Sequence, residues 1–496
     1  MILRPKRPQP AKPTLLEKLL AKPVYKEIPI AVVQHGAVVP LGVMVRGTME
    51  WLLDKPMLET LFQQHAPDQY TRELTISALV QLFIQVSTGA RPSVHAAFKA
   101  DQAADEPTIE TTYQAVYGKL GRLQPAVSEA VVRYSAERCG QLLTANPTPR
   151  KEPLPGYRMR VLDGNVLTGT DHRLKGLRRW LNACLPGKSL VIYEPGLGLV
   201  TDLVLEEDAY TQERALLTQI LPRLQIKDLV VADRNFCTTR FVFGVAGQKA
   251  FTIVRQHRIN LPCTPISKLK KCGQTDTGAV YEQNVQVTDP DSGAVLTLRR
   301  IEVRLLQKTR DGDRTIAVLT NLPQQVSAAQ IADIYRQRWT IEKHFQFLTQ
   351  SLNCEVSGLG KPRAALFAFA MALVAANALA VVRGTLRSVH GVEAEAEISG
   401  YYLADEVAGD YRTVMKYLPP EEWLGWNSLP TLAMAKLLCA IAQHVRLKGL
   451  TRSQRGPKCQ QRFRNGPKWR FGSVQSAGVR PRLLSQEIQE KSRKVQ

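Results

Sequence analysis

Apolar residues recur at helical spacing between residues 51 and 143. The segments "ELTISALVQLFIQVS", "TTYQAVYGKLGRL" and "AVSEAVVRYSAERCGQLL" repeat apolar positions three or four residues apart, which is the period of an amphipathic helix. We expect a helical domain over residues 49–145. The stretch "TANPTPRKEPLPGY" follows with four prolines and is typical of a linker.

From residue 155 the apolar pattern becomes that of strands. The runs "YRMRVLDGN", "KSLVIYEPG" and "LGLVTDLVLEED" are β-rich, whereas "TQERALLTQILPRL" has the spacing of one amphipathic helix. The run "DLVVADRNF" is apolar without alternation, as in a strand buried on both faces. A helix at "TTRFVFGVAG" and a strand at "AFTIVRQ" complete the order β-β-β-α-β-α-β. This order predicts an α/β fold over residues 155–258, in which helices cover a mixed sheet.

Residues 259–322 alternate between apolar and polar positions, as antiparallel strands do. Turn residues at 289–293 and 311–312 mark two hairpins. We interpret this stretch as a β-rich insertion into the α/β core. Helix resumes near Ser327 and runs through "YRQRWTIEKHFQFLTQ" at 335–350, so the core is expected to continue over residues 323–400.

The two ends of the chain differ from its middle. Residues 1–48 begin with the basic, Pro-rich "MILRPKRPQPAKP" and are expected to form a loosely structured arm, while helices are expected over 401–445. Residues 446–496 hold 14 Lys or Arg and 2 acidic residues, which gives this tail a charge of +12. Interleaved aromatic residues suit a contact with nucleic acid, and a solvated, disordered tail is an equal alternative.

The stretch "AALFAFAMALVAANALAVV" at 364–382 is long and apolar enough to cross a membrane. It is dominated by alanine, which gains little in lipid, and it contains Asn377. A helix that is apolar on all sides is also what a multilayered core buries. We therefore expect a core helix and no membrane association.

The amino-acid composition indicates what kind of molecule the protein binds. The chain holds 66 Lys or Arg against 44 Asp or Glu, a net charge of +22, which favours nucleic acid first and an anionic membrane surface second. The 8 cysteines form no CxxC pair and the 8 histidines form no HExxH motif. This pattern indicates a reduced, cytosolic protein without a structural zinc site or a disulfide scaffold.

Three carboxylates stand out by position. Asp163 and Asp233 each end an expected strand, and Glu342 lies in the expected helix. Ligands bind at the strand ends of open α/β sheets, so the two aspartates can converge there and Glu342 can join them from a covering helix. Such acids repel one another unless cations neutralise them, and oxygen ligands suit Mg²⁺.

The helix that carries Glu342 predicts a second group of residues. At about 100° per residue, Tyr335, Arg338 and Glu342 share one face beside an apolar stripe. The alternative is a surface ion pair between Arg338 and Glu342 that contributes about 0.3 kcal/mol. We favour a functional face, because two strand-end acids await a partner.

These residues carry a resemblance to a known family. The spacing Y-x2-R-x3-E-x6-K is the signature of bacterial insertion-sequence transposases of the DDE class, the IS-four type, and this sequence matches it at Tyr335, Arg338 and Glu342. "LDGN" at Asp163 and "DRNF" at Asp233 resemble the two aspartate motifs of that family, which also has a β-rich insertion before the glutamate.

The resemblance implies an RNase H-like fold and a metal-dependent reaction on double-stranded DNA. Asp163, Asp233 and Glu342 would be the catalytic and metal-binding residues and would hold two Mg²⁺ ions, for which Mn²⁺ can substitute. The enzyme would cut at the ends of its insertion element and join the freed 3′-hydroxyl to target DNA. Arg338 would bind a phosphate beside Tyr335. The helical domain would read the element ends, with a purely structural role as the alternative. A homodimer would form on DNA in the bacterial cytoplasm, at the nucleoid.

The sequence departs from the family at several positions. Thr349 stands where the signature has Lys, and Lys343 or Lys361 could take over its contact with DNA. Asn235 replaces the usual Gly, and Asn165 stands where Thr or Ser is common. The insertion lacks a tryptophan that stacks on a flipped base in some relatives, a role that Tyr281 or Trp339 could take.

Two other functions remain open at this point. One is an RNase H-like, metal-dependent nuclease that cuts DNA without strand transfer. The other is a DNA-binding regulator descended from a transposase, in which the acids are only structural. The intact set of three acids argues against the regulator, and Thr349 keeps it open.

Overall fold

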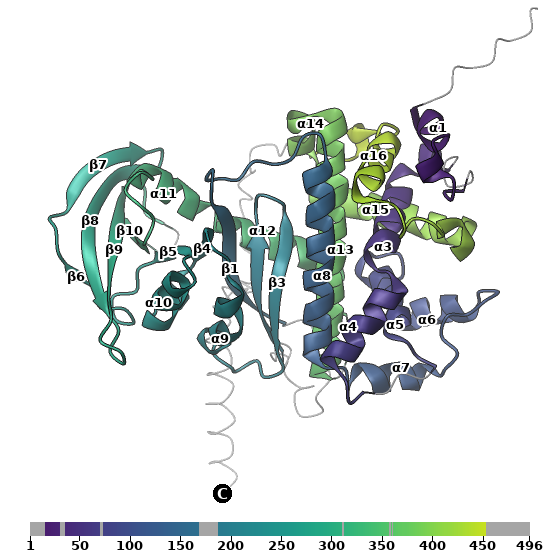
Figure 1. The fold of residues 1–496 in the computed structure, drawn as a ribbon, viewed down its shortest axis with the longest axis horizontal. Helices are drawn as coiled ribbons and strands as arrows, with labels where there is room; N and C mark the ends of the chain where they lie inside the picture. The colour runs from purple at the N-terminus through teal and green to yellow at the C-terminus, as the bar shows by residue number, and fades with distance from the viewer. Residues whose placement is uncertain are drawn as a thin grey trace, which may run out of the picture. The chain divides into compact units, whose positions relative to one another are not determined.

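The computed structural model describes residues 15–29, 35–69, 73–167, 187–309, 312–356, 359 and 361–452 (Figure 1). The chain divides into two compact units. The described part of unit 1 lies within residues 15–55, 138–149 and 378–452, and that of unit 2 within 56–137 and 150–377. This division cuts across the segment boundaries expected from the sequence, which stay predictions. The basic tail lies outside the described residues from residue 453 onward.

A ten-stranded mixed sheet forms the centre of unit 2. Its order is β3-β2-β1-β4-β5-β10-β9-β8-β6, with β7 paired to β8. Strands β1, β4 and β5 are parallel, while β2 and β3 add to β1 in antiparallel fashion. The mixed sheet is confirmed, and the order of its first five strands is consistent with an RNase H-like fold. The strands are β1 (Arg158–Val166), β2 (Lys188–Glu194), β3 (Leu199–Glu206), β4 (Asp228–Ala232), β5 (Phe251–Arg255), β6 (Thr264–Pro265), β7 (Lys270–Thr275), β8 (Gly278–Thr288), β9 (Val295–Leu305) and β10 (Thr315–Thr320).

The strands of the expected insertion continue the core sheet. Strand β10 pairs antiparallel with β5, with Leu319 opposite Val254, and its other edge pairs with β9. Strands β9 and β8 then pair along their whole length. The insertion therefore extends one edge of the sheet through backbone hydrogen bonds.

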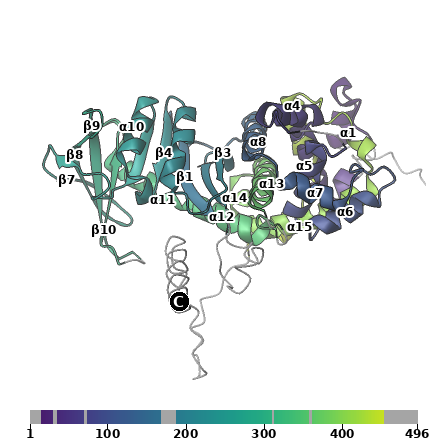
Figure 2. The same cartoon turned by 90° about the horizontal axis from the view of Figure 1, so that it is seen from below.

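Helices cover both faces of the sheet (Figure 2). On one face, α10 (Thr239–Gly247) packs on Leu162, Val230 and Val254 of the strands. On this face the stretch expected as one amphipathic helix forms three short segments, and Pro222, which has no N–H to donate, lies in the last of them. These segments are η3 (Glu213–Leu216), α9 (Leu217–Ile220) and η4 (Leu221–Arg223).

The opposite face carries the stretch that the sequence presented as one helix. A capping box at Ser327 starts α11 (Ala328–Arg336), as expected, but α11 ends before α12 (Trp339–Ser351) begins. The backbone N–H groups of residues 337, 338, 340 and 341 bond to carbonyls three residues earlier, so a tighter turn replaces the α-helical ladder here. The expected single helix was therefore wrong: Tyr335 lies in the last turn of α11, while Arg338 is the N-cap of α12 and Glu342 lies in its first turn.

The rest of unit 2 is helical. Phe83 and Phe367 pack edge to face at 5.1 Å, and the buried Glu129 accepts a hydrogen bond of 2.9 Å from the backbone of Leu205 in β3. The helices are α4 (Lys55–His65), α5 (Ile76–Ser87), α6 (Val94–Gln102), α7 (Tyr113–Leu120), most of α8 (Pro125–Ala145) and the first half of α13 (Pro362–His390).

Helix α13 contains the long apolar stretch. It passes a length and composition test for a membrane span, but 94% of its most apolar window is buried inside the protein. Asn377 is the polar residue within this apolar stretch, and its side chain has hydrogen-bond partners. Its side chain accepts a bond of 2.9 Å from the N–H of Val200 and donates one of 3.0 Å to the carbonyl of the same residue, as a neighbouring strand would. Both observations favour a core helix.

Unit 1 is helical. Its core includes Trp51, whose indole donates a 2.8 Å hydrogen bond to the Leu429 carbonyl, and Trp426, whose ring fills the space beside Gly47. The described part of the expected basic arm forms helices, because leucines 16 and 19 and the apolar residues of α3 are buried. The elements are α1 (Leu15–Leu20), η1 (Pro23–Tyr25), α3 (Pro40–Leu52), the ends of α8 and α13, α14 (Val392–Glu397), α15 (Gly400–Tyr417), η6 (Pro420–Trp423), α16 (Thr431–Ala442) and η7 (Leu447–Gly449).

Candidate active site

Asp163 and Asp233 come together through the register of two parallel strands. Leu162 of β1 lies beside Ala232 of β4. The residue after each of them is an aspartate, so Asp163 and Asp233 are neighbours at the spacing of adjacent strands, about 4.8 Å. Asp163 Oδ1 accepts a 3.0 Å hydrogen bond from the N–H of Gly164. Asp233 Oδ1 accepts one of 2.7 Å from the N–H of Asn235 and caps η5 (Arg234–Phe236).

The carboxyl group of Asp163 is in an environment that disfavours its charge. Burial first, and then the nearby carboxylates of Asp233 and Glu213, raise the pKa of Asp163 to about 7, although Arg338 opposes them. An acid that is buried beside other acids is stable in its charged form only with a cation close by. This is the electrostatic setting of a cation-binding site.

Arg338 connects Asp163 with Glu342. Its Nη2 donates a 2.7 Å hydrogen bond to Glu342 Oε1, and its Nη1 lies 3.6 Å from Asp163 Oδ2. Burial opposes the charge of Arg338, but Tyr335, Asp163 and Glu342 together hold its pKa above its ordinary value. The first turn of α12 also suits Glu342, because a helix N-terminus favours negative charge.

Tyr335 completes this group from the end of α11. The residue is 8% exposed, and burial raises the pKa of its hydroxyl, while Arg338 and Arg255 act in the opposite direction. Its side chain is hydrogen-bonded to Arg338, and the charge of Asp233 also raises its pKa. Tyr335, Arg338 and the three acids are thus one connected group, although Tyr335 and Arg338 belong to separate elements.

The two candidate lysines are not part of this group. Lys343 is exposed on α12. Lys361 is also exposed, and its side chain lies over Gly121 at the end of α7. Thr349 is exposed, and its hydroxyl bonds back to the carbonyl of Phe345 at 3.1 Å. The roles of these residues in DNA binding stay predictions.

Two residues beside the acids were not identified from the sequence as members of the site. Glu213, the first residue of η3, accepts a 2.7 Å hydrogen bond from the side chain of Asn235. Arg255, at the end of β5, lies near Tyr335 and pairs with Asp313 at 2.6 Å. Glu213 stands in a stretch with helical spacing and in no motif, so only the folded chain shows its place.

The donors at this site fit a divalent cation in their chemistry. All are carboxylates, the ligands that Mg²⁺ and Mn²⁺ prefer. Asp233 directly follows β4, as expected, but the expectation that Asp163 ends its strand was wrong, because β1 continues to Val166 in pairing with β2. Among the residues that the structure describes, no three Asp, Glu, His or Cys side chains stand close enough to hold a metal ion. Glu342 is linked to Asp163 through Arg338, so the carboxylates would have to move closer together on binding a cation.

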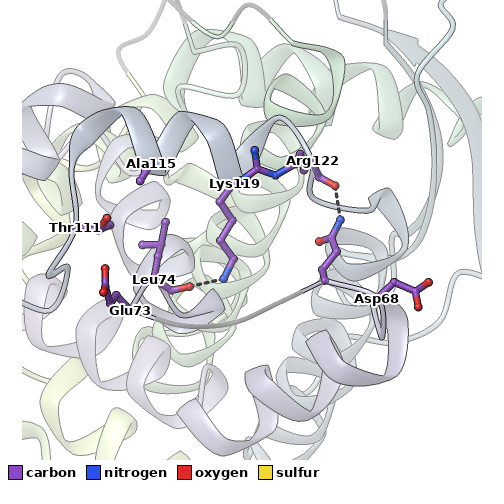
Figure 3. A pocket seen from close by; sticks show the side chains of 8 residues that line it. Asp68, Glu73, Leu74, Thr111, Ala115, Lys119 and Arg122 are labelled. Atoms are coloured by element: carbon purple, nitrogen blue, oxygen red, sulfur yellow. Dashed lines mark hydrogen bonds between the residues drawn. The ribbon is translucent and has the colours of Figure 1, made fainter.

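A separate cavity of about 490 Å³ lies among the helices of unit 2 (Figure 3). It is lined by Asp68, Glu73, Thr111, Lys119 and Arg122, among others. Lys119 already donates a hydrogen bond to the Leu74 carbonyl, and none of the three acids lines this cavity. The cavity is therefore distinct from the candidate active site.

The segment that holds these residues is similar to a known family. Residues 155–378 match the sequence model of a family described as the transposase DDE domain. No curated protein matches the chain. The matched segment begins just before β1 and ends within α13, so it contains Asp163, Asp233 and Glu342. The match over these residues supports a DDE-type transposase.

Proposed function

We propose that the protein cuts DNA at the ends of its own insertion element and joins the freed end to target DNA, in a reaction that depends on Mg²⁺. One observation carries this proposal: Asp163 within β1 lies beside Asp233, which directly follows the parallel strand β4, and Arg338 ties Glu342 to the same place. The family match over residues 155–378 supports the reaction class.

The proposed reaction consists of two displacements at phosphorus. In the first, water attacks a phosphodiester at the element end, the bond to the 3′-oxygen breaks, and a free 3′-hydroxyl results. In the second, that hydroxyl attacks a target phosphodiester, and the target's own 3′-oxygen leaves. Each nucleophile loses its proton and each leaving oxygen gains one, so both steps balance without an oxidant or reductant.

Asp163, Asp233 and Glu342 would hold two Mg²⁺ ions, or Mn²⁺ in their place. When bound, these ions would lower the pKa of the attacking hydroxyl and stabilise the negative charge on the leaving oxygen. If either of these two effects stabilises the transition state by several kcal/mol, the reaction becomes roughly a hundredfold to a thousandfold faster.

Arg338 would bind a phosphate next to the scissile bond. Its Nε is buried and has no hydrogen-bond partner among the described residues. This N–H can therefore still donate a hydrogen bond, next to the Nη2 group that binds Glu342. Tyr335 packs against Arg338 and would keep the guanidinium in place. Exposed Lys343 and Lys361 would hold the DNA further from the scissile bond.

Other parts of the proposal rest on the resemblance to IS-four-type transposases. The helical region at 49–145 would read the sequence of the element ends. A homodimer would bridge two ends in the complex with DNA, and the protein would act in the bacterial cytoplasm, at the nucleoid. The net charge of +22 suits a protein that works on DNA.

The decisive experiment is cleavage of a labelled duplex that spans one end of the element carrying this gene. The wild type with Mg²⁺ should nick this duplex and, with a supplied target, yield a joined product. Asp163→Ala should bind the duplex but cut it at least roughly a hundredfold more slowly. A wild type that binds and never nicks would establish a regulator, and cutting without any joined product would establish a nuclease.

A further inference from the structure

Arg255 lies in the same row of the sheet as Asp163 and Asp233. The residues directly before these three, at positions 162, 232 and 254, are partners in the parallel register of β1, β4 and β5, and they belong to the core under α10. Strand side chains alternate between the two faces of a sheet, and the backbone of Asp233 is still extended. All three side chains therefore point away from α10, to the face on which Asp163 approaches Arg338.

This position suits a contact between Arg255 and DNA. Arg255 is one strand spacing, about 4.8 Å, from Asp233 and two spacings from Asp163. Its charge already acts on Tyr335, because Arg255 and Arg338 both lower the pKa of that hydroxyl. The phosphates of one DNA strand follow one another at about 3.4 Å along the helix axis. A phosphodiester bound at the aspartates would therefore have a neighbouring phosphate close to Arg255.

A carboxylate of the protein already binds this guanidinium. Nη2 of Arg255 donates a 2.6 Å hydrogen bond to Oδ2 of Asp313. Asp313 lies in the hairpin between β9 and β10, where its backbone N–H donates a 3.0 Å bond to the hydroxyl of Thr309 and its carbonyl accepts one of 2.9 Å from the N–H of Thr309. Because β10 runs antiparallel to β5, this hairpin holds Asp313 at the end of the sheet where Arg255 lies.

The ion pair between Arg255 and Asp313 is exposed enough to exchange its partner. The side chain of Arg255 is 25% exposed and that of Asp313 is 41% exposed, and ion pairs in contact with solvent contribute roughly 0–1 kcal/mol. An arginine binds phosphate with the same fork of charged N–H donors that it offers to a carboxylate. A DNA phosphate can therefore replace the carboxylate of Asp313 with little loss of free energy. Arg338 differs, because its side chain is 12% exposed and already serves the active-site acids.

We propose that the ion pair between Arg255 and Asp313 is an autoinhibitory contact, in which Asp313 occupies the guanidinium that binds a DNA phosphate beside the aspartates. DNA that enters the site takes Arg255 from Asp313, and the carboxylate of Asp313 turns to solvent. This inference rests on the proposed function, because it names a contact that regulates the entry of DNA into the same site. The simpler alternative is that the ion pair only fixes the hairpin to β5.

Substitutions of the two partners distinguish these roles. Asp313→Asn removes the competing charge and keeps the size of the side chain, while Asp313→Ala removes the whole side chain beyond Cβ. Arg255→Ala removes the proposed contact with phosphate. Asp333→Asn is the matched control, because Asp333 on α11 is 50% exposed and pairs with the exposed Arg336 at 3.6 Å. It changes the net charge equally and leaves the partner of Arg255 in place.

The test is the affinity of the full-length protein for a fluorescent duplex of one element end, measured by anisotropy without divalent cations so that no DNA is cut. Both variants at position 313 should bind about 2- to 5-fold more tightly than Asp333→Asn. Arg255→Ala should bind about 10-fold more weakly than the wild type and lower the slope of log Kd against log salt concentration by about one unit. In an Arg255→Ala background, Asp313→Asn should have no more effect than Asp333→Asn, because no guanidinium remains to be released.

The outcomes also distinguish this inference from the proposed function. If Asp313→Asn binds DNA no more tightly than Asp333→Asn, the ion pair only holds the hairpin; the inference is then wrong, and the transposase proposal, which depends on cleavage, stands. Tighter binding that persists in the Arg255→Ala background would show a general effect of charge and would also overturn the inference. If Asp313→Asn binds more tightly only when Arg255 is present, but the wild type never nicks the duplex with Mg²⁺, the autoinhibitory contact stands and the transposase proposal is wrong.

Discussion

Arg338 Nη2 donates a 2.7 Å hydrogen bond to Glu342 Oε1 at the start of α12. The two residues are one helical turn apart, as in an ordinary surface pair, but Arg338 is 12% exposed in its side chain and also approaches Asp163. A planar guanidinium can serve two carboxylates at once, whereas an ammonium group is a single point of charge. The pair therefore determines where Glu342 can lie relative to Asp163.

Substitutions of Arg338 should distinguish the effect of its positive charge from the effect of its planar guanidinium group. We expect Arg338→Lys to slow cleavage about 10- to 100-fold, because it loses one charged hydrogen bond of roughly 1.5–3 kcal/mol, and Arg338→Ala to slow it further. Cleavage rates at saturating DNA provide the measurement. Arg336→Lys is the matched control, since Arg336 at the end of α11 is 48% exposed. Full activity of Arg338→Lys would show that charge alone suffices.

Thr349 occupies the position where the resembled signature has lysine. Its exposure on α12 leaves space for a longer side chain, so Thr349→Lys should fold normally. The added cation should strengthen binding to element-end DNA and increase the dependence of log Kd on log salt concentration by about one unit. A salt titration of binding measures this slope.

The neighbouring residue provides the control for Thr349→Lys. Gln350→Lys adds the same charge at an exposed position one residue further along α12, which points about 100° away around the helix. It should have less effect on end binding. An unchanged affinity of Thr349→Lys would mean that another cation, such as Lys343, already makes this contact.

Glu194 gives the stability of the protein a dependence on pH. Burial raises the pKa of Glu194 from its ordinary 4.5 to about 7, although Arg160 and Arg158 oppose the shift. Between these values the folded state keeps a proton that the unfolded state has lost, so stability decreases as pH rises from 4.5 to about 7. The total contribution is on the order of 3 kcal/mol and is lost by pH 8.

Glu194→Gln should remove this pH dependence. The free energy of unfolding of the variant, relative to the wild type, should rise by roughly 3 kcal/mol between pH 4 and pH 8. Urea denaturation at several pH values measures the difference. Glu110→Gln, at an exposed position, should stay parallel to the wild type. A Glu194→Gln difference that is constant with pH would contradict the prediction.

The side chain of Asn377 should be essential for stability despite its apolar surroundings. Asn377→Leu leaves the N–H and the carbonyl of Val200 without their partner, at a cost of about 1–3 kcal/mol for each buried group. The free energy of unfolding should therefore decrease by about 2–6 kcal/mol. Gln350→Leu, at an exposed position, should alter the free energy of unfolding by less than about 0.5 kcal/mol. A neutral Asn377→Leu would mean that the added apolar packing offsets the lost bonds.

The features that were predicted from the sequence depend on local patterns. The apolar run before Asp233 indicates a buried strand, and the return of helical spacing near Ser327 indicates a helix start, because both depend on neighbouring residues. The features that were missed depend on contacts between residues distant in the sequence, or on a change of backbone conformation that no residue type indicates. No proline or glycine signals the break at Gln337, and nothing near Glu213 reveals that Gly164 leaves room for it. The continuation of the sheet through β5 and β10 likewise requires pairing across the whole insertion.

The division of the chain between its two units has a consequence for biosynthesis. Unit 1 begins before residue 56 but needs residues 378–452 for completion, whereas the described part of unit 2 ends at residue 377. Chains leave the ribosome from the N-terminus, and domains generally fold as units. The first helices to be synthesised, α1 and α3, must therefore wait through most of translation for their partners α15 and α16, so the unit that starts first is the last to be finished.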